Sequence, residues 1–188
     1  MAFRAVLDAC VLYPFSLRDL LLRLADIELY DPYWSQRILE EVTRNLVDNE
    51  AMPAHKAERL AATMRAAFDA AEVPELAIVQ LEPAMTNHPK DRHVLAAAVA
   101  AHAQAVVTHN LSDFAPEDCE PLGIKALHPD EFLLVLYDKR PEQLRRTLRE
   151  QAGDLTSPPV ELPELLDMLS KAVPRFVNQV RTDLRRTA

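Results

Sequence analysis

Four short apolar segments, separated by longer helical patterns, constrain the fold of this chain more than any other feature. They are residues 3–7, 77–81, 105–108 and 124–127. Short apolar runs bounded by polar residues predict buried strands. Strands that alternate with helices favour a parallel sheet with right-handed crossovers. We therefore predict an α/β fold in which a parallel sheet is flanked by helices.

Helix signals occupy the segments between these strands. Ser16 and Asp19 form a capping-box pattern, and Ser35 is a suitable N-cap for the next helix. Pro89 suits the first turn of an alanine-rich helix that runs to about residue 103. After Asp138 prolines separate short helical segments and no strand signal remains. We predict one α/β domain over residues 1–137 and a small all-helical C-terminal extension over residues 138–188.

The composition excludes several classes of protein. Only two glycines occur, Gly123 and Gly153, whereas phosphate-binding loops and dinucleotide fingerprints need several that are closely spaced. The cysteines, Cys10 and Cys119, lack zinc or redox spacing. No membrane span or signal peptide is indicated, so we expect a cytoplasmic protein.

The charge is distributed unevenly along the chain. The net charge of −8 argues against coating nucleic acid by bulk electrostatics. From Lys139 onward there are ten basic and seven acidic residues, against eleven and twenty-two before it. The basic tail is either a set of solvated helix faces or a surface for an acidic partner.

Acidic residues stand at the ends of predicted strands and at helix starts. Asp8 directly follows the first strand, Asp113 lies shortly after the strand at 105–108, and Asp91 opens the alanine-rich helix. The carboxyl ends of parallel strands meet at one edge of a sheet, where working residues collect. Gathered carboxylates repel one another unless a hard cation neutralises them. The pattern predicts a Mg²⁺ or Mn²⁺ site.

Glu40 and Glu41 form an adjacent pair on the predicted second helix. Neighbouring helical residues point about 100° apart, so at least one of the two faces solvent. We select Glu41 as the fourth acid and leave its identity open by one position.

The segments VLDACVLYP, ILEEVTRNL, KDRHVLAAAVA and VVTHNLSDF, in this order, resemble the PIN domain, most closely the VapC-type toxins of toxin–antitoxin pairs. The resemblance covers roughly residues 1–137, and the tail resembles the helical extension of a larger VapC subgroup. It implies a five-stranded parallel sheet and a ribonuclease that binds one or two Mg²⁺ or Mn²⁺ ions.

The resemblance also assigns roles and partners. Asp8, Glu41, Asp91 and Asp113 match the catalytic and metal-binding acids of the family, and Asn110 and Thr108 match supporting polar residues. The implied partners are RNA and a VapB-like antitoxin that enters the acidic groove. Homodimers are common in such folds, and we expect exposed apolar contacts at Leu17, Leu20 and Trp34.

Two alternatives stay open at this stage. Asp8 could be phosphorylated in a Mg²⁺-dependent phosphotransferase or phosphatase, although the usual second acid two residues on is here Cys10. The second alternative is that the chain is a non-catalytic PIN-like binding module that has lost metal binding. The spacing of the histidines does not predict zinc, and we expect them in loops or on the surface, with His93 a candidate for phosphate contact.

Overall fold

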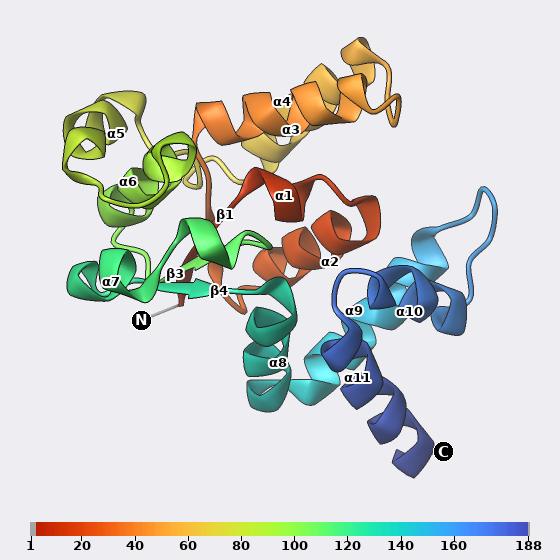
Figure 1. Ribbon diagram of the computed structural model, residues 1–188. Coiled ribbons are helices and arrows are strands. Elements are labelled where there is room, and N and C mark those ends of the chain that lie inside the picture. Colours follow the sequence, from red (N-terminus) through yellow and green to blue (C-terminus); the bar gives the residue numbers. More distant parts are fainter. Residues whose placement is uncertain (1–2, 188) are drawn as a thin grey trace. The chain divides into compact units, whose positions relative to one another are not determined.

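The computed structural model describes residues 3–187, and these form two compact units (Figure 1). The first comprises the chain up to Tyr13 together with Tyr30–Leu127, and the second comprises Pro14–Leu29 and the chain from His128 onward. The domain boundary predicted between residues 137 and 138 stays a proposal. None of the helices within residues 3–187 has both the length and the apolar character to span a bilayer.

The first unit is built on a four-stranded sheet, which confirms the predicted α/β class. Its strands are β1 (Arg4–Leu7), β2 (Asp31–Tyr33), β3 (Ala105–Val107) and β4 (Lys125–Leu127). They lie in the order β2-β1-β3-β4, and every neighbouring pair is parallel. Leu7 pairs with Val107, so Asp8 and Thr108 leave the two central strands at the same level.

The edge beyond β2 explains why four strands are found where the resemblance implied five. Trp34 forms a single parallel bridge with Glu72. The Trp34 N–H donates to the Ala71 carbonyl (3.0 Å), and the Val73 N–H donates to the Trp34 carbonyl (2.8 Å). Pro74 follows at once and begins a helix, so the pairing stops after one bridge.

The strand predicted at residues 77–81 is wrong, because this segment belongs to helix α5 (Glu75–Leu81). Pro74 is the N-cap and Glu75 lies in the first turn, both of which favour a helix. A short apolar run cannot by itself distinguish a strand from a helix. Here Ile78 is buried while Leu76 and Val79 remain exposed.

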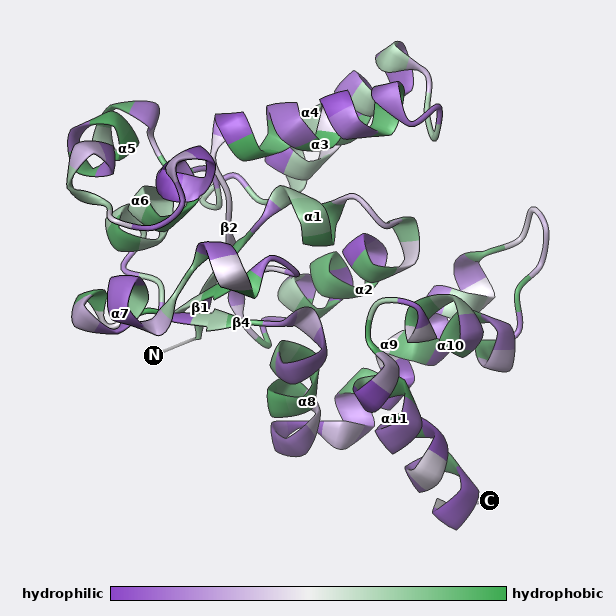
Figure 2. Cartoon of the chain, viewed as in Figure 1, coloured by the Kyte–Doolittle hydropathy of each residue, from purple (hydrophilic) through white to green (hydrophobic). Residues whose placement is uncertain are grey.

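Helices surround this sheet. The helical elements of the first unit are α1 (Ala9–Leu12), α3 (Gln36–Asp48), α4 (Ala54–Ala67), α5, η1 (Glu82–Ala84), η2 (Pro89–Asp91), α6 (Arg92–Ala100), η3 (Leu111–Asp113), α7 (Pro116–Cys119) and η4 (Glu120–Leu122). Helix α6 packs on β1 and β3, and α3 packs on α1 and α4. Apolar and hydrophilic colours alternate along α3 and α4 in Figure 2, as expected for half-buried helices.

The sequence signals of α3 are confirmed in detail. The Ser35 hydroxyl accepts a hydrogen bond from the Ile38 N–H at 3.1 Å, so Ser35 is the N-cap. The four apolar residues predicted to face inward are all buried: Ile38, Leu39, Val42 and Leu46. This fixes the rotation of α3 and therefore which of its acidic residues can face the sheet edge.

The regular elements in the described part of the second unit are all helices, and Thr156 and Pro159 form one isolated antiparallel bridge. The unit contains α2 (Phe15–Asp26), α8 (Pro129–Lys139), α9 (Pro141–Asp154), α10 (Leu162–Ser170) and α11 (Pro174–Thr187). The capping box predicted at Ser16 is wrong: α2 starts at Phe15 with Pro14 as N-cap and no side-chain cap. A side-chain cap is present at the start of another helix, α11. Asp130 of α8 accepts hydrogen bonds there from the Arg175 and Phe176 N–H groups at 3.0 and 2.7 Å.

The expected apolar dimer contacts are not available on the surface. Leu17, Leu20 and Trp34 each have 0% exposure, because the first two belong to the core of the second unit and Trp34 to that of the first. They are core residues. The sequence pattern identified them as apolar but did not show that other parts of the chain cover them.

Candidate active site

Asp8 stands where β1 ends and α1 begins. It is the N-cap of α1, and its Oδ1 accepts from the Ala9 N–H at 2.6 Å. Its backbone N–H donates to the Val107 carbonyl at 3.1 Å, which ties it to the end of β3. Only 3% of the residue is exposed. The carboxylate is therefore held rigidly at the carboxyl edge of the two central strands.

Thr108 connects Asp8 to the loop after β3. The buried Thr108 hydroxyl donates to Asp8 Oδ2 at 2.7 Å and accepts from the Asn110 N–H at 3.0 Å. Asn110 itself is exposed at the start of η3. Thr108 therefore contacts Asp8 directly, whereas Asn110 is connected to it through the Thr108 hydroxyl.

Cys10 was not predicted as part of this site. Its thiol lies 3.2 Å from Asp8 Oδ2 and 3.4 Å from Thr108 Oγ1, and the His109 N–H donates to it at 3.2 Å. Burial, followed by the charge of Asp8, raises the pKa of the Cys10 thiol to about 12. The group is a protonated thiol at neutral pH, suited to donate to Asp8 rather than to attack a substrate.

Asp91 and Asp113 meet at the same place from different segments. Asp91 closes η2 just before α6, and Asp113 closes η3. Ligand atoms of Asp91, Asp113 and His88 all lie within 4.8 Å of one another. The His88 Nδ1 is 3.2 Å from Asp91 Oδ2. His88 is the second residue that sequence reasoning missed; its position three residues before Asp91, around Pro89, was the available signal.

The electrostatics of Asp91 bring Asp8 into the same cluster. The pKa of Asp91 is raised, first by burial and then by the negative charges of Asp8 and Asp113, while His88 opposes the shift. A carboxylate whose ionised form is disfavoured by its like-charged neighbours gains most from a bound cation. The oxygen-rich donor set fits a hard divalent ion.

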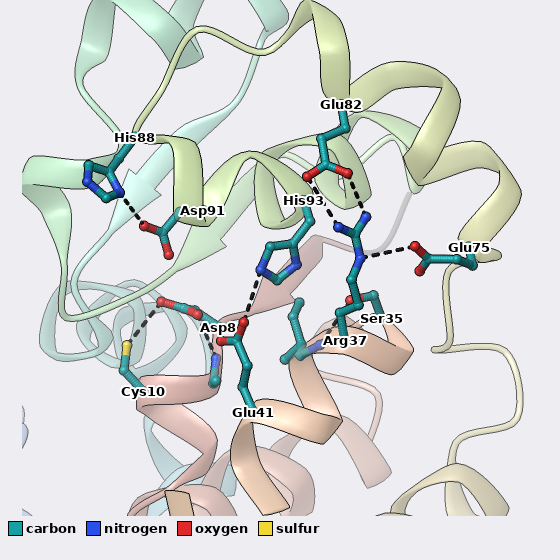
Figure 3. Close-up of polar contacts among 12 residues, drawn as sticks. Asp8, Cys10, Ser35, Arg37, Glu41, Glu75, Glu82, His88, Asp91 and His93 are labelled. Carbon is teal, nitrogen blue, oxygen red and sulfur yellow. Dashed lines mark hydrogen bonds and ion pairs between the residues drawn. The ribbon is translucent and has the colours of Figure 1, made fainter. Parts of the chain in front are cut away.

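Glu41 faces this region and Glu40 does not. His93, buried on α6, places its Nε2 3.2 Å from Glu41 Oε1. Glu40 is exposed and accepts from Gln36 Nε2 at 2.7 Å. Figure 3 shows the side chains of Asp8, Glu41 and Asp91 turned toward one region, with His88 and His93 at its border. The contact that positions Glu41 is with His93, and not with another acid.

An arginine one turn before Glu41 adds ion pairs to the apolar packing that orients α3. Arg37 forms ion pairs with Glu75 at 3.0 Å and with Glu82 at 2.8 Å (Figure 3). These partners lie on α5 and η1, so α3 is joined to the segment that leads into the His88 loop.

These features define a PIN domain. The family described as "PIN domain" matches residues 4–112, which is more than half of the chain, and the chain belongs to this family. The family described as "VapC50 C-terminal domain" matches residues 129–182. The chain is therefore a PIN-domain protein whose helical C-terminal region is similar to that of VapC50, which supports the resemblance that the sequence motifs predicted.

The similarity extends to a curated relative. The chain is 44% identical over 98 residues to "Putative ribonuclease VapC50" of Mycobacterium tuberculosis (strain ATCC 25618 / H37Rv). The match covers 52% of this chain and 58% of the relative, so the chain spans little more than half the length of that protein. No solved structure matches the chain.

Proposed function

We propose that this chain is a metal-dependent endoribonuclease that acts as the toxin of a type II toxin–antitoxin pair. One observation carries the proposal: in a PIN-family chain, Asp8, Asp91 and Asp113 come from separate segments yet share one electrostatic site. The name of the curated relative, a ribonuclease, supports the same reaction class.

The metal ligands that we propose are Asp8, Asp91 and Asp113, with Glu41 completing the set or orienting the attacking water. When bound, Mg²⁺ or Mn²⁺ supplies Lewis acidity toward a phosphodiester and lowers the pKa of a nearby water. The protein contributes fixed carboxylates, and no side-chain nucleophile is required. Ser112, next to Asp113, is exposed.

Asp8 is already oriented before any cation or substrate arrives. An ionised carboxylate has about four lone-pair positions. The Ala9 N–H occupies one on Oδ1, while the Thr108 hydroxyl and the Cys10 thiol both approach Oδ2. One position on Oδ1 is left for a further partner. A group held in this way loses little entropy when it binds a ligand.

Regulation by a VapB-like antitoxin fits the same charge pattern. An arginine or lysine from a partner chain would neutralise the clustered carboxylates, because cation and metal respond to the same negative potential. We propose that such a partner is encoded beside this gene and that its basic segment occupies the acidic site. The proposed substrate is RNA.

The activity is tested by one carboxylate-to-amide substitution. Purified wild type incubated with total cellular RNA and Mn²⁺ should create new 5′ ends, and Asp8→Asn should lower the cleavage rate by about a thousandfold, since a lost metal ligand removes several kcal/mol of transition-state stabilisation. Asp48→Asn, an exposed change at the end of α3, is the matched control and should cleave normally.

The same variants test the toxin assignment in cells. Expression of the wild type or Asp48→Asn without the neighbouring gene should arrest growth, whereas Asp8→Asn should not. Undiminished RNA cleavage by a folded Asp8→Asn protein would refute the proposed mechanism.

A further inference from the structure

We propose that His88 is a nitrogen ligand of the divalent cation at this site and that it shifts the preference of the site from Mg²⁺ toward Mn²⁺. The inference rests on the proposed metal-dependent function. It adds to the carboxylate set a residue for which the family motifs provide no role.

The first argument is the spacing of the ligand atoms. His88 Nδ1 lies 3.2 Å from Asp91 Oδ2, and one ligand atom from each of His88, Asp91 and Asp113 lies within 4.8 Å of the others. Adjacent ligands of an octahedral ion with bonds of about 2.1 Å are about 3 Å apart. The His88–Asp91 pair already has the separation of two neighbouring ligands.

The second argument is that the backbone holds His88 next to both acids. The His88 N–H donates to the Asp113 carbonyl at 3.3 Å, and the Asp91 N–H donates to the His88 carbonyl at 2.9 Å. The side chain of Asn87, a residue only 2% exposed, also donates to the Asp113 carbonyl at 3.3 Å. The backbone of His88 is joined to the two segments that supply the carboxylates, while 46% of the His88 side chain stays accessible to an incoming ion.

The chemistry of the nitrogen determines the metal preference. Mg²⁺ takes oxygen ligands almost exclusively and gives up its waters reluctantly. Nitrogen donors increase the affinity for first-row transition ions, of which Mn²⁺ is the one most compatible with a carboxylate-rich site. A site with three carboxylates and one imidazole should therefore prefer Mn²⁺ over Mg²⁺. A site with carboxylates alone would bind the two ions more equally.

A simple ion pair between His88 and Asp91 makes the opposite prediction. A protonated imidazole would compete with the cation for Asp91, so removal of His88 would strengthen metal binding. If His88 is a ligand, its removal weakens Mn²⁺ binding and leaves Mg²⁺ binding nearly unchanged. The sign of the change in affinity separates the two cases.

The experiment measures Mn²⁺ binding to the full chain by electron paramagnetic resonance, and Mg²⁺ by its competition with Mn²⁺. The variants are His88→Ala and His88→Gln, with His55→Ala, an exposed histidine on α4, as the matched control. We expect His88→Ala to weaken Mn²⁺ binding about tenfold, in the range seen when residues that support a metal site are lost. Mg²⁺ binding should change much less.

Pulsed measurements on the bound Mn²⁺ give a readout independent of activity. A ¹⁴N coupling should be present in the wild type and in His55→Ala, and absent in His88→Gln. A coupling that persists in His88→Gln, or unchanged or tighter Mn²⁺ binding in the His88 variants, overturns the inference and leaves the proposed nuclease standing. If the wild type binds neither ion, the proposed function fails as well.

Discussion

Two buried aspartates, one in each unit, show how the same side chain serves different ends. Asp130 is 4% exposed, and each of its oxygens accepts one backbone N–H at the start of α11. Asp8 is 3% exposed, but its partners include a hydroxyl and a thiol, and it lies close enough to Asp91 to raise the pKa of that group. Burial is equal in the two, and only the partners differ.

The lesson is that the partners of a buried carboxylate are more informative than its burial. Backbone N–H groups cannot reverse their role, so Asp130 is matched to a helix end and serves stability. Hydroxyl groups can donate or accept, and like charges nearby oppose ionisation. Asp8 therefore lies beside like charges that favour a further positive partner, whereas the carboxylate of Asp130 is matched to backbone N–H groups at a helix end.

The largest expected effect comes from exchanging carboxylate for amide at both positions. In Asp130→Asn an NH₂ group faces a backbone N–H, so the free energy of unfolding should fall by about 1–3 kcal/mol, the cost of an unsatisfied buried donor. In Asp8→Asn the Ala9 N–H still finds an oxygen and the Thr108 hydroxyl can turn to accept. The stability of that variant, measured by urea unfolding in the presence of a chelator, should change by less than about 1 kcal/mol.

The functional outcomes of this pair should be reversed. Mn²⁺ binding should be lost in Asp8→Asn and retained in folded Asp130→Asn. Equal losses of stability in the two variants would break the comparison between a structural and a functional aspartate.

Helix ends offer a matched pair with a smaller effect, again one in each unit. Glu28 after α2 and His102 after α6 have φ of 58° and 51°, in the left-handed region that favours glycine. Both ends have the 6→1 hydrogen bond of a Schellman motif. It runs from the Leu29 N–H to the Leu24 carbonyl after α2, and from the Ala103 N–H to the Ala98 carbonyl after α6. Glu28→Gly and His102→Gly should each raise the free energy of unfolding by about 0.5–1 kcal/mol.

Alanine at the same positions is the control, since it keeps the strained φ without the original side chain. Thermal unfolding of Gly and Ala variants should differ by that amount. Indistinguishable Gly and Ala variants would show that the left-handed backbone is not strained at that helix end.

The smallest effect is expected from pH, because Asp91 is partly exposed and solvent screens its neighbours. Its native pKa is raised above the ordinary 3.8, so over the interval between the two values the native state binds more protons than the unfolded state. The contribution of Asp91 to the free energy of unfolding therefore falls as the pH is raised through that interval when no cation is present. Asp91→Asn should flatten this slope.

Denaturant unfolding across that interval, with and without Mn²⁺, measures the slope. In the wild type, Mn²⁺ should also flatten the slope, because the bound cation stabilises the ionised form of Asp91. A slope that is unchanged or more negative in Asp91→Asn than in the wild type would mean that Asp8 and Asp113 do not act on Asp91 as described.

The sequence alone determined the fold class, and it selected the four acids of the proposed site. Short apolar runs bounded by polar residues predicted β1, β3 and β4. Ser35, followed by apolar residues at helical spacing, predicted α3. An acid in the segment that follows a strand is placed near the sheet edge by topology, which is why Asp8, directly after β1, and Asp113, in the loop after β3, could be selected. These features are local, so they can be recognised along one chain.

Tertiary structure decided what depends on neighbours distant in the chain. Residues 77–81 form a helix because Pro74 and the packing of α5 set the conformation of this segment. The hydrophobicity of the segment does not set it. Glu41 was separated from Glu40 by its contact with His93, and His88 joined the acids through hydrogen bonds to Asp113. Hydrophobic periodicity specifies which faces are buried, whereas the partner of a polar group is fixed only when separate segments meet in space.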